Sequence, residues 1–334
     1  MAAAVTPKRQ SKSLPFTLRT VKSLAAWTCA TLMLDFLYMV FHGGVFQRRE
    51  SRPRARRLRF ARSYIAKNRA ARIACIVLPT FNEVQNLPRL LPLIFQEAEN
   101  IPTHELHVLV VDDESPDGTA DYVRAAMGLY PRLHLLTRKR NGLGAAYKHG
   151  ISHAIETLNP DLILQMDADF QHDPAQLPEM IRLSEDGYDL VIGSRFAAGT
   201  DIPGLSWQRK LISRGGTRLV WWFGRIPHIQ DCTSGFRCIR TELITTCTFG
   251  PYSTRGYSFQ SWFLCELLRN GARYIEIPIE FPLRVYGSSK LTSRDKFEFL
   301  VSLLHLPFRA KNGHAEAIED EAAGNGEGNF KFQI

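Results

Sequence analysis

Two carboxylates stand one residue apart in the segment MDADFQHDP, residues 166–174, directly after the apolar run DLILQ. If that run is a strand that continues through Asp167, alternation places Asp167 and Asp169 on the same side, with Cα atoms about 7 Å apart. Such a pair repels and resists ionisation, and a shared divalent cation removes the repulsion. The spacing favours a metal or phosphate site, with turn capping as the alternative. Asp173 followed by Pro174 has the pattern of a helix start.

The positive charge of the chain is concentrated near its N-terminus. Residues 1–70 hold 15 Lys and Arg against Asp35 and Glu50, so their balance is +13 and the rest contributes −4 to the net charge of +9. The basic run at 48–63 suits anionic lipid headgroups, at about 1 kcal/mol per basic residue near a charged membrane surface. Nucleic acid is the other candidate partner, but no reading module accompanies the run. We expect a membrane surface and no nucleic acid, with a solvated linker as the plain alternative.

One segment is a candidate membrane anchor, LAAWTCATLMLDFLYMVF at residues 24–41. Its length is about the minimum needed to span a bilayer, and Asp35 offsets most of the insertion free energy of its apolar residues. We interpret it as a marginal anchor, either a short span or a helix lying in the interface. A secretory signal and a transit peptide remain open. More basic residues follow it than precede it, which predicts that the following domain faces the cytoplasm.

The six cysteines show no Cys-x-x-Cys pair and no regular spacing. We therefore expect neither a disulfide framework nor a zinc site, in a reducing compartment. Cys75 lies within the apolar run IACIVL and is expected to be a core residue.

From Arg72 onward, apolar runs of strand length alternate with stretches of helix length. The expected strands are 73–80, 105–113, 133–138, 161–167, 189–194 and 274–281. The expected helices are 84–99, 117–129, 143–157, 174–186, 206–224, 256–271 and 296–308. This alternation predicts a parallel α/β sheet, with ligands at the carboxyl ends of the strands. Polar segments stand at those ends: PTFNE, DDESPDG, DAD and GSR. Pro278 indicates an edge strand.

Three regions follow from these patterns. Residues 1–71 form a basic N-terminal region with the marginal anchor, 72–310 a catalytic domain, and 311–334 a Gly- and Glu-rich tail that we expect to be disordered. The basic and aromatic helices at 206–224 and 296–308 flank the expected site and favour an interfacial surface.

Nine short blocks carry a family resemblance: LPTFNE, VVDDESPDGT, RKRNGLGAAYKHG, MDADFQH, GSR, RKLISRGG, DCTSGFR, GYSFQ and RVYGSSK. In order and spacing, over residues 72–308, they resemble dolichyl-phosphate mannose synthases, which are polyprenyl-phosphate mannosyltransferases of the inverting glycosyltransferase family 2. The resemblance implies a GT-A fold, Rossmann-like and mostly parallel with flanking helices. It also implies transfer of mannose from GDP-mannose to a dolichyl or polyprenyl monophosphate, by one displacement with inversion.

The resemblance assigns the donor nucleotide to Pro79, Phe81, Glu83, Asp113, Asp167, Ala168 and Asp169. Carboxylates there accept hydrogen bonds from the base and ribose, and the aromatic ring packs on the base. The segment SPDG has the pattern of a type I turn, so we assign a turn role to Asp117 and a ligand role to Asp113. Gly142 and Gly144 lack the full dinucleotide fingerprint and predict a close backbone approach at a helix start.

The resemblance assigns a metal to Asp167, Asp169 and Gln171. Ligation by oxygen alone selects Mg²⁺ or Mn²⁺ over zinc, and the cation would bridge the donor diphosphate and stabilise the leaving nucleoside diphosphate. His172 is expected at the surface or behind these ligands.

No general base is evident, and the resemblance explains why none is needed. A lipid phosphate has its second pKa near 6, so at neutral pH it is already nucleophilic and needs a cationic clamp. The matching family positions are Arg195, Arg209, Arg284 and Lys290, which together with Asp169 we expect to be catalytic. Arginine offers bidentate geometry to phosphate and lysine a compact charge.

Two residues depart from the family pattern. Trp262 stands where many relatives have Glu, and the Glu114 that follows Asp113 is the second departure. The first leaves acceptor-side detail open. The alternatives are a UDP-sugar enzyme of the glucose type with the same kind of lipid, and a non-catalytic membrane adaptor with this fold. Accessory membrane subunits are not required. The expected location is the endoplasmic reticulum membrane of a eukaryote or the plasma membrane of a prokaryote.

Overall fold

The computed structural model describes residues 72–197, 207–224, 226, 229–247, 256, 258–280, 282 and 301–303, with side chains of the 207–224 helix from Arg214 onward. All of them belong to the compact unit Glu50–Ile334. The expected anchor at 24–41, the basic run at 48–63, the tail and most of 296–308 lie outside the described residues. Within the described part of the chain, no helix combines the length and apolar character needed to cross a membrane.

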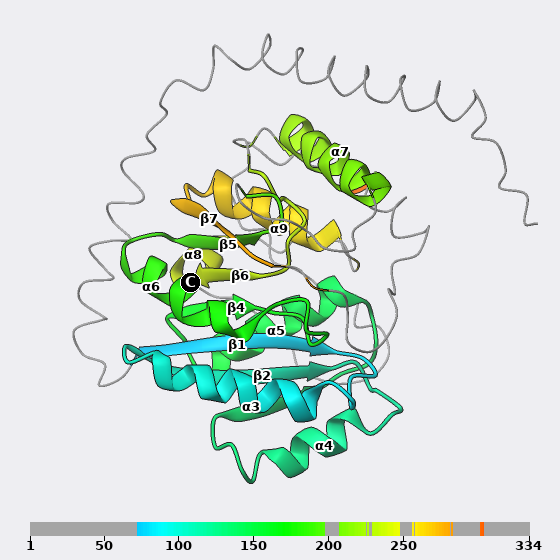
Figure 1. Cartoon of the computed structure of the whole chain (residues 1–334), viewed down its shortest axis with the longest axis vertical. Helices are drawn as coiled ribbons and strands as arrows, with labels where there is room; N and C mark the ends of the chain where they lie inside the picture. Colours follow the sequence, from blue (N-terminus) through cyan, green and yellow to red (C-terminus); the bar gives the residue numbers. More distant parts are fainter. Residues whose placement is uncertain are drawn as a thin grey trace, which may run out of the picture. The chain divides into compact units, whose positions relative to one another are not determined.

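A seven-stranded sheet is the centre of the fold, with the strand order β3-β2-β1-β4-β6-β5-β7 (Figure 1). Its strands are β1 (Arg72–Thr80), β2 (His104–Asp112), β3 (Leu133–Thr137), β4 (Leu162–Gln165), β5 (Leu190–Ser194), β6 (Arg237–Arg240) and β7 (Tyr274–Pro278). β6 runs antiparallel to both β4 and β5, and all other pairs are parallel. The carboxyl ends of six strands and the amino end of β6 therefore meet at one edge of the sheet.

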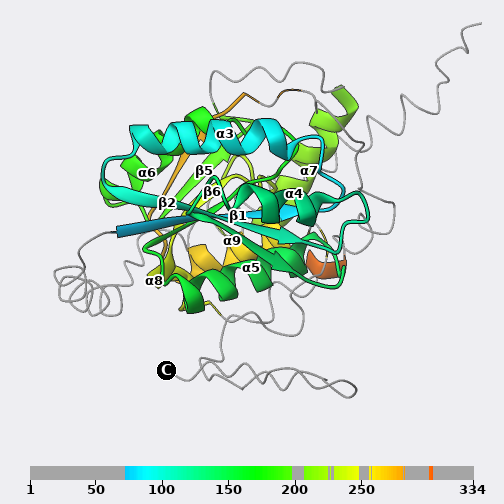
Figure 2. The ribbon, with the colours of Figure 1, turned by 90° about the horizontal axis from the view of Figure 1, so that it is seen from below.

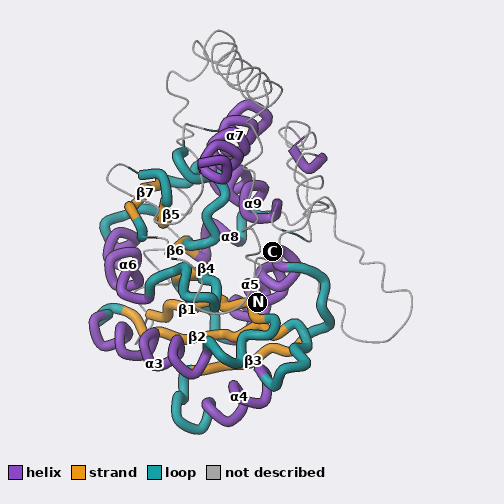
Figure 3. Tube along the Cα trace, turned by 45° about the vertical axis from the view of Figure 1, so that its right-hand side comes forward, coloured by secondary structure: helices purple, strands orange, loops and turns teal. Residues whose placement is uncertain are grey.

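Helices cover both faces of this sheet (Figure 2). They are α3 (Leu87–Glu97), α4 (Thr119–Ala126), α5 (Leu143–Thr157), α6 (Leu177–Glu185), α7 (Trp207–Gly224), α8 (Thr241–Ile244) and α9 (Ser258–Arg269), with the short 3-10 turns η2 (Ala98–Asn100) and η3 (Pro174–Gln176). Alternate residues of the strands pack on one side against α3, α4 and α6, and on the other against α5, α7, α8 and α9. Figure 3 shows the same helices and strands as a tube, turned by 45° from the view of Figure 1.

The expected strand and helix pattern is largely confirmed. The helix expected at 143–157 is α5, and Gly142 before it has φ +90°, a backbone conformation that suits glycine. Pro278 ends β7 at the edge of the sheet, as expected. Cys75 is fully buried, and the five cysteines of the described residues are free thiols.

Two expectations about the central strands are wrong. The expected strand 161–167 ends at Gln165, so the side-chain alternation of a strand does not apply to the aspartates after it. The antiparallel strand β6 was not predicted, because its four residues follow the polar block DCTSG without a run of strand length. β6 matters for the site, since it brings that block to the carboxyl edge of the parallel strands.

Candidate active site

The acidic segment after β4 forms a tight turn at the carboxyl edge of the sheet. Phe170 has φ +64° within it, and Ala168 and Asp169 are buried. The Asp169 carboxylate accepts the backbone N–H of Gln171 at 3.2 Å. Directly after the turn, Asp173 caps η3 by accepting the N–H of Ala175 at 3.0 Å, which confirms the helix start at that point.

Two buried side chains fix Asp167 from behind. The Tyr147 hydroxyl of α5 donates to Asp167 Oδ1 at 2.8 Å, and the backbone N–H of Asp167 donates to His172 Nδ1 at 2.9 Å. His172 is 2% exposed and its ring stacks on Phe236, so the surface alternative for His172 is wrong. Burial raises the pKa of Tyr147 well above its usual range, and the charge of Asp167 raises it further. Tyr147 therefore remains a proton donor to the carboxylate.

The acidic turn supplies oxygen ligands of the kind that Mg²⁺ and Mn²⁺ prefer. Within the described residues, no group of three or more His, Cys, Asp and Glu side chains is arranged to hold a metal by itself. Gln171 donates its amide nitrogen to the carbonyl of Pro282 at 3.3 Å, which orients the amide. Two carboxylates and one amide oxygen are donors whose chemistry would fit a hard divalent cation.

The first expected donor segment follows β1. Pro79 lies in β1 beside Val111, and the Phe81 ring lies under the Arg140 guanidinium, 3.7 Å from its carbon atom. The Glu83 carboxylate accepts the Asn86 amide at 2.6 Å. The guanidinium makes a cation–π contact and covers one face of the Phe81 ring. The arginine was not predicted.

The second donor segment follows β2. Asp113 is 5% exposed and pairs with Arg138 Nη1 at 2.7 Å, an arginine that sequence reasoning also missed. Burial raises the pKa of Asp113, although Arg138 acts in the opposite direction. The neighbouring Asp112 links the two strand ends, accepting the Thr80 hydroxyl at 2.9 Å. Asp117 accepts the N–H groups of Thr119 and Val84 at 3.0 and 3.1 Å, which confirms its turn role.

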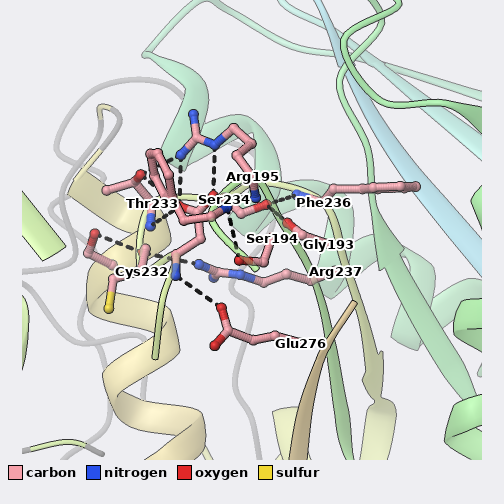
Figure 4. Close-up of polar contacts among 12 residues, drawn as sticks. Gly193, Ser194, Arg195, Cys232, Thr233, Ser234, Phe236, Arg237 and Glu276 are labelled. Carbon is pink, nitrogen blue, oxygen red and sulfur yellow. Dashed lines mark hydrogen bonds and ion pairs between the residues drawn. The ribbon is translucent and has the colours of Figure 1, made fainter. Parts of the chain in front are cut away.

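Arg195, directly after β5, is locked to the block DCTSGFR. Its Nε and Nη2 donate to the two carboxylate oxygens of Asp231 at 2.7 and 2.8 Å, and Nη2 also donates to Thr233 Oγ1 at 2.6 Å (Figure 4). Burial opposes the charge of Arg195, but the attraction and hydrogen bonds of Asp231 outweigh it and raise the pKa of Arg195. The Arg195 side chain stays 17% exposed while Asp231 is fully covered.

Arg237, the last residue of the same block, is fully buried. Nη1 donates to the carbonyl of Gln260 at 2.8 Å and Nη2 to the carbonyl of Cys232 at 3.3 Å, while Nε has no partner. Burial lowers its pKa to about 10. A Cβ on Gly235 would stand 3.3 Å from Gln260 Nε2 and 3.8 Å from Asp167 Oδ2, so the absence of a side chain there lets the block lie against the acidic turn.

The other expected clamp residues are only partly visible. Arg209 lies in α7, where only the backbone is described, and Arg284 and Lys290 lie outside the described residues. Their joint role with Arg195 stays a prediction. Trp262 is 4% exposed and packs into the core on the α9 side, so this departure from the family pattern is a core residue.

A mostly parallel sheet with an acidic turn, carboxylate-bearing loops and an arginine at its carboxyl edge has the architecture of α/β proteins that bind their ligands at that edge. Comparison with known proteins identifies the family. Residues 75–242 match the model described as "Glycosyl transferase family 2". The chain belongs to this family and is a glycosyltransferase with a GT-A fold.

Several proteins are similar to this chain over most of its length. It is 35% identical over 220 residues to an undecaprenyl-phosphate mannosyltransferase of Micrococcus luteus, covering 65% of this chain and 86% of that protein. It is 29% identical over 248 residues to a polyprenol monophosphomannose synthase of Mycolicibacterium smegmatis, covering 73% and 90%. The solved structure of Mycobacterium tuberculosis glucosyl-3-phosphoglycerate synthase with Mn²⁺ and UDP-glucose has the same fold, with TM-score 0.50, 19% identity and coverage of 77% and 88%. The expected relationship to polyprenyl-phosphate mannosyltransferases is confirmed.

Proposed function

We propose that this enzyme transfers mannose from GDP-mannose to a polyprenyl or dolichyl monophosphate. The observation that carries the proposal is the arrangement of opposite charges at one edge of the sheet. The acidic turn with Asp167 and Asp169 follows β4, and the partly exposed Arg195 follows β5, with β6 between them. The two relatives above are named for mannose transfer to polyprenyl phosphates, which supports the same acceptor and sugar here.

The reaction is one in-line displacement. A phosphate oxygen of the lipid attacks the anomeric carbon of the sugar, and the bond from that carbon to the donor diphosphate breaks, so that the nucleoside diphosphate leaves with the electron pair. The anomeric configuration inverts. Because the attacking phosphate is mostly a dianion at neutral pH, no protein base is required. Arg195 binds and orients the anion, together with Arg209, Arg284 and Lys290.

The donor side of the site is divided between three segments. Phe81 under Arg140 offers a face for the base, and Glu83 and Asp113 accept hydrogen bonds from the base and ribose. Asp167, Asp169 and Gln171 would hold Mg²⁺ or Mn²⁺, which when bound neutralises the diphosphate and stabilises the leaving group. Tyr147 and His172 hold Asp167 in place for this task. The Mn²⁺ bound with UDP-glucose in the fold relative supports the use of a divalent metal.

A lipid acceptor implies work at a membrane surface. The basic run at 48–63 and the marginal anchor at 24–41 would keep the enzyme there, with the catalytic domain on the cytoplasmic side and no obligatory accessory subunit. Removing residues 1–45 tests the anchor: the shortened enzyme should lose its sedimentation with vesicles of neutral lipid, to which the basic run at 48–63 is not attracted, and full retention would refute the anchor.

The test of the reaction is direct. Purified enzyme is incubated with polyprenyl phosphate, Mg²⁺ or Mn²⁺, and labelled GDP-mannose or UDP-glucose, and the lipid is extracted. We expect label in the lipid from GDP-mannose. Label from UDP-glucose alone would replace the donor by the glucose-type alternative, and no label from any donor would favour the adaptor.

Asp169→Ala should reduce the transfer to almost nothing, because the acidic turn loses one of its two carboxylates. Asp173→Ala is the matched control: it removes an aspartate of the same segment that only caps η3, so activity should survive. Equal loss in both variants would show that the segment, and not the paired carboxylates, is what matters.

A further inference from the structure

A carboxylate on the edge strand β7 holds the loop that locks Arg195. Glu276 accepts the backbone N–H of Gln230 at 2.8 Å on one oxygen and that of Asp231 at 3.0 Å on the other. In Figure 4, Glu276 and Arg195 lie on opposite sides of the loop that carries Cys232, Thr233 and Ser234. Nothing in the sequence pattern of YIEIPIEF distinguishes this glutamate from an ordinary strand residue.

The loop held in this way carries the partner of Arg195. Asp231 accepts three hydrogen bonds from Arg195, from Nε, Nη2 and the backbone N–H, the last at 3.1 Å. The Asp231 carboxylate also accepts the backbone N–H and the hydroxyl of Thr233 at 3.2 and 3.1 Å. Any shift of residues 230–231 would therefore move the guanidinium of Arg195.

The loop is surrounded by buried charges of both signs. The carboxylates of Glu276 and Asp231 lie close enough to repel, Arg195 pairs with Asp231, and the buried Arg237 also attracts Asp231. Burying an ion pair with a second carboxylate near it is an expensive way to fix a loop. An arginine that binds an anionic ligand in one orientation needs its guanidinium held by neighbouring hydrogen bonds of this kind.

We propose that Glu276 is a positioning residue for the acceptor phosphate. By holding the backbone of residues 230–231, it keeps the Asp231 carboxylate where it aims the Arg195 guanidinium. The inference rests on the proposed function, because it takes the anion bound by Arg195 to be the lipid phosphate. Glu276 touches no substrate in this scheme and acts only through Asp231 and Arg195.

The fold contains a matched pair for comparison at the opposite edge of the sheet. Asp189, before β5, lies 3.6 Å from Arg240 Nε and accepts the backbone N–H of Arg273 at 3.0 Å. The Arg240 side chain is 17% exposed, the same as that of Arg195. This ion pair is looser than Arg195–Asp231 and its aspartate is 24% exposed, but the Asp189 carboxylate also accepts a backbone N–H, and it lies at the amino end of the strands, away from the site.

The test is Glu276→Gln. The amide keeps the size of the side chain but replaces one of the two acceptor oxygens by a donor, so one of the two N–H bonds is lost. We expect the KM for polyprenyl phosphate to rise about tenfold, the scale of one lost hydrogen bond to a charged group, while the KM for the donor stays within about twofold. Glu276→Asp keeps both oxygens and should recover part of the acceptor affinity. Asp189→Asn, the matched control, should lower the melting temperature without changing the KM for the acceptor.

A double-mutant cycle separates positioning from general support. If Glu276 acts through Arg195, then Glu276→Gln should add less than about twofold to the acceptor KM of an Arg195→Gln enzyme. Multiplicative effects of the two changes would overturn the inference, as would a rise confined to the donor KM or an equal effect of Asp189→Asn. If the proposed function itself is wrong, the result differs from all of these, because the unmodified enzyme then transfers no sugar to the lipid. If Glu276→Gln does not fold, the cycle is run with Glu276→Asp under the same criteria.

Discussion

Removing the Tyr147 hydroxyl group tests whether its hydrogen bond orients the Asp167 carboxylate for a cation. In Tyr147→Phe the ring stays in the core against Phe259, whose centroid is 6.4 Å away, but the 2.8 Å hydrogen bond to Asp167 Oδ1 is lost. A hydrogen bond to a charged group contributes about 1.5–3 kcal/mol. Residues that orient a metal-binding carboxylate typically change metal affinity about 10- to 100-fold when removed, which corresponds to about 1.4–2.8 kcal/mol. The two scales agree.

We therefore expect Tyr147→Phe to raise the Mn²⁺ concentration for half-maximal transfer about 10- to 100-fold, with a modest loss of thermal stability. Activity is titrated with Mn²⁺ at saturating donor and acceptor, and Mn²⁺ binding is followed separately by the signal of the free ion in electron paramagnetic resonance. The control is Tyr130→Phe, which removes a hydroxyl from a ring stacked on Phe95, on the other side of the sheet. An unchanged Mn²⁺ requirement in Tyr147→Phe, with normal folding, would refute the role of the hydroxyl.

Two further predictions concern stability. Gly150→Ala places a Cβ 2.6 and 2.7 Å from methyl groups of Val77 and Val111, so it should destabilise the fold by about 1–3 kcal/mol in denaturant unfolding. The control Gly128→Ala meets only a carbonyl oxygen at 3.4 Å and should be neutral. Equal unfolding midpoints for the two variants would contradict the predicted clash at Gly150. His107 and His134 share a 2.9 Å contact, and burial lowers the pKa of both. Because the unfolded state then binds more protons, stability should be lost as the pH falls below about 6.5. Thermal melts should show a weaker loss in His134→Gln, and an identical pH profile would refute the assignment.

The parts of the fold that sequence reasoning predicted are those governed by local patterns. α5 was predicted residue for residue, with Gly142 expected at the start of the helix, and the structure gives this glycine φ +90°. The buried strands β1 and β2 were predicted to within a residue from their apolar runs. The position of the acidic pair at the carboxyl edge also followed from the sheet rule, although its geometry did not, since the aspartates lie in a turn and not on β4.

What sequence reasoning missed depends on contacts between distant segments. Tyr147 belongs to the block RKRNGLGAAYKHG, but only the fold brings its hydroxyl to Asp167, 20 residues away. Asp231 was quoted within DCTSGFR without a role, because its pairing with Arg195 spans 36 residues and needs the unpredicted strand β6. Glu276 had no signal at all, since it acts on backbone N–H groups 45 and 46 residues away, which any sequence could supply.

The two arginines at this loop show why burial alone does not mark a functional cation. Arg237 is fully buried, its guanidinium donates to the carbonyl oxygens of Gln260 and Cys232, and burial lowers its pKa to about 10. Arg195 is held by a carboxylate that raises its pKa, and it keeps part of its surface exposed. A paired arginine has less net charge to attract a dianion than an unpaired one, but its orientation is already fixed. The attraction of the lipid phosphate to the site must then come from several cations together, while Arg195 orients the phosphate. Because this role depends on the position of the Arg195 guanidinium, a residue as remote as Glu276 would affect acceptor binding.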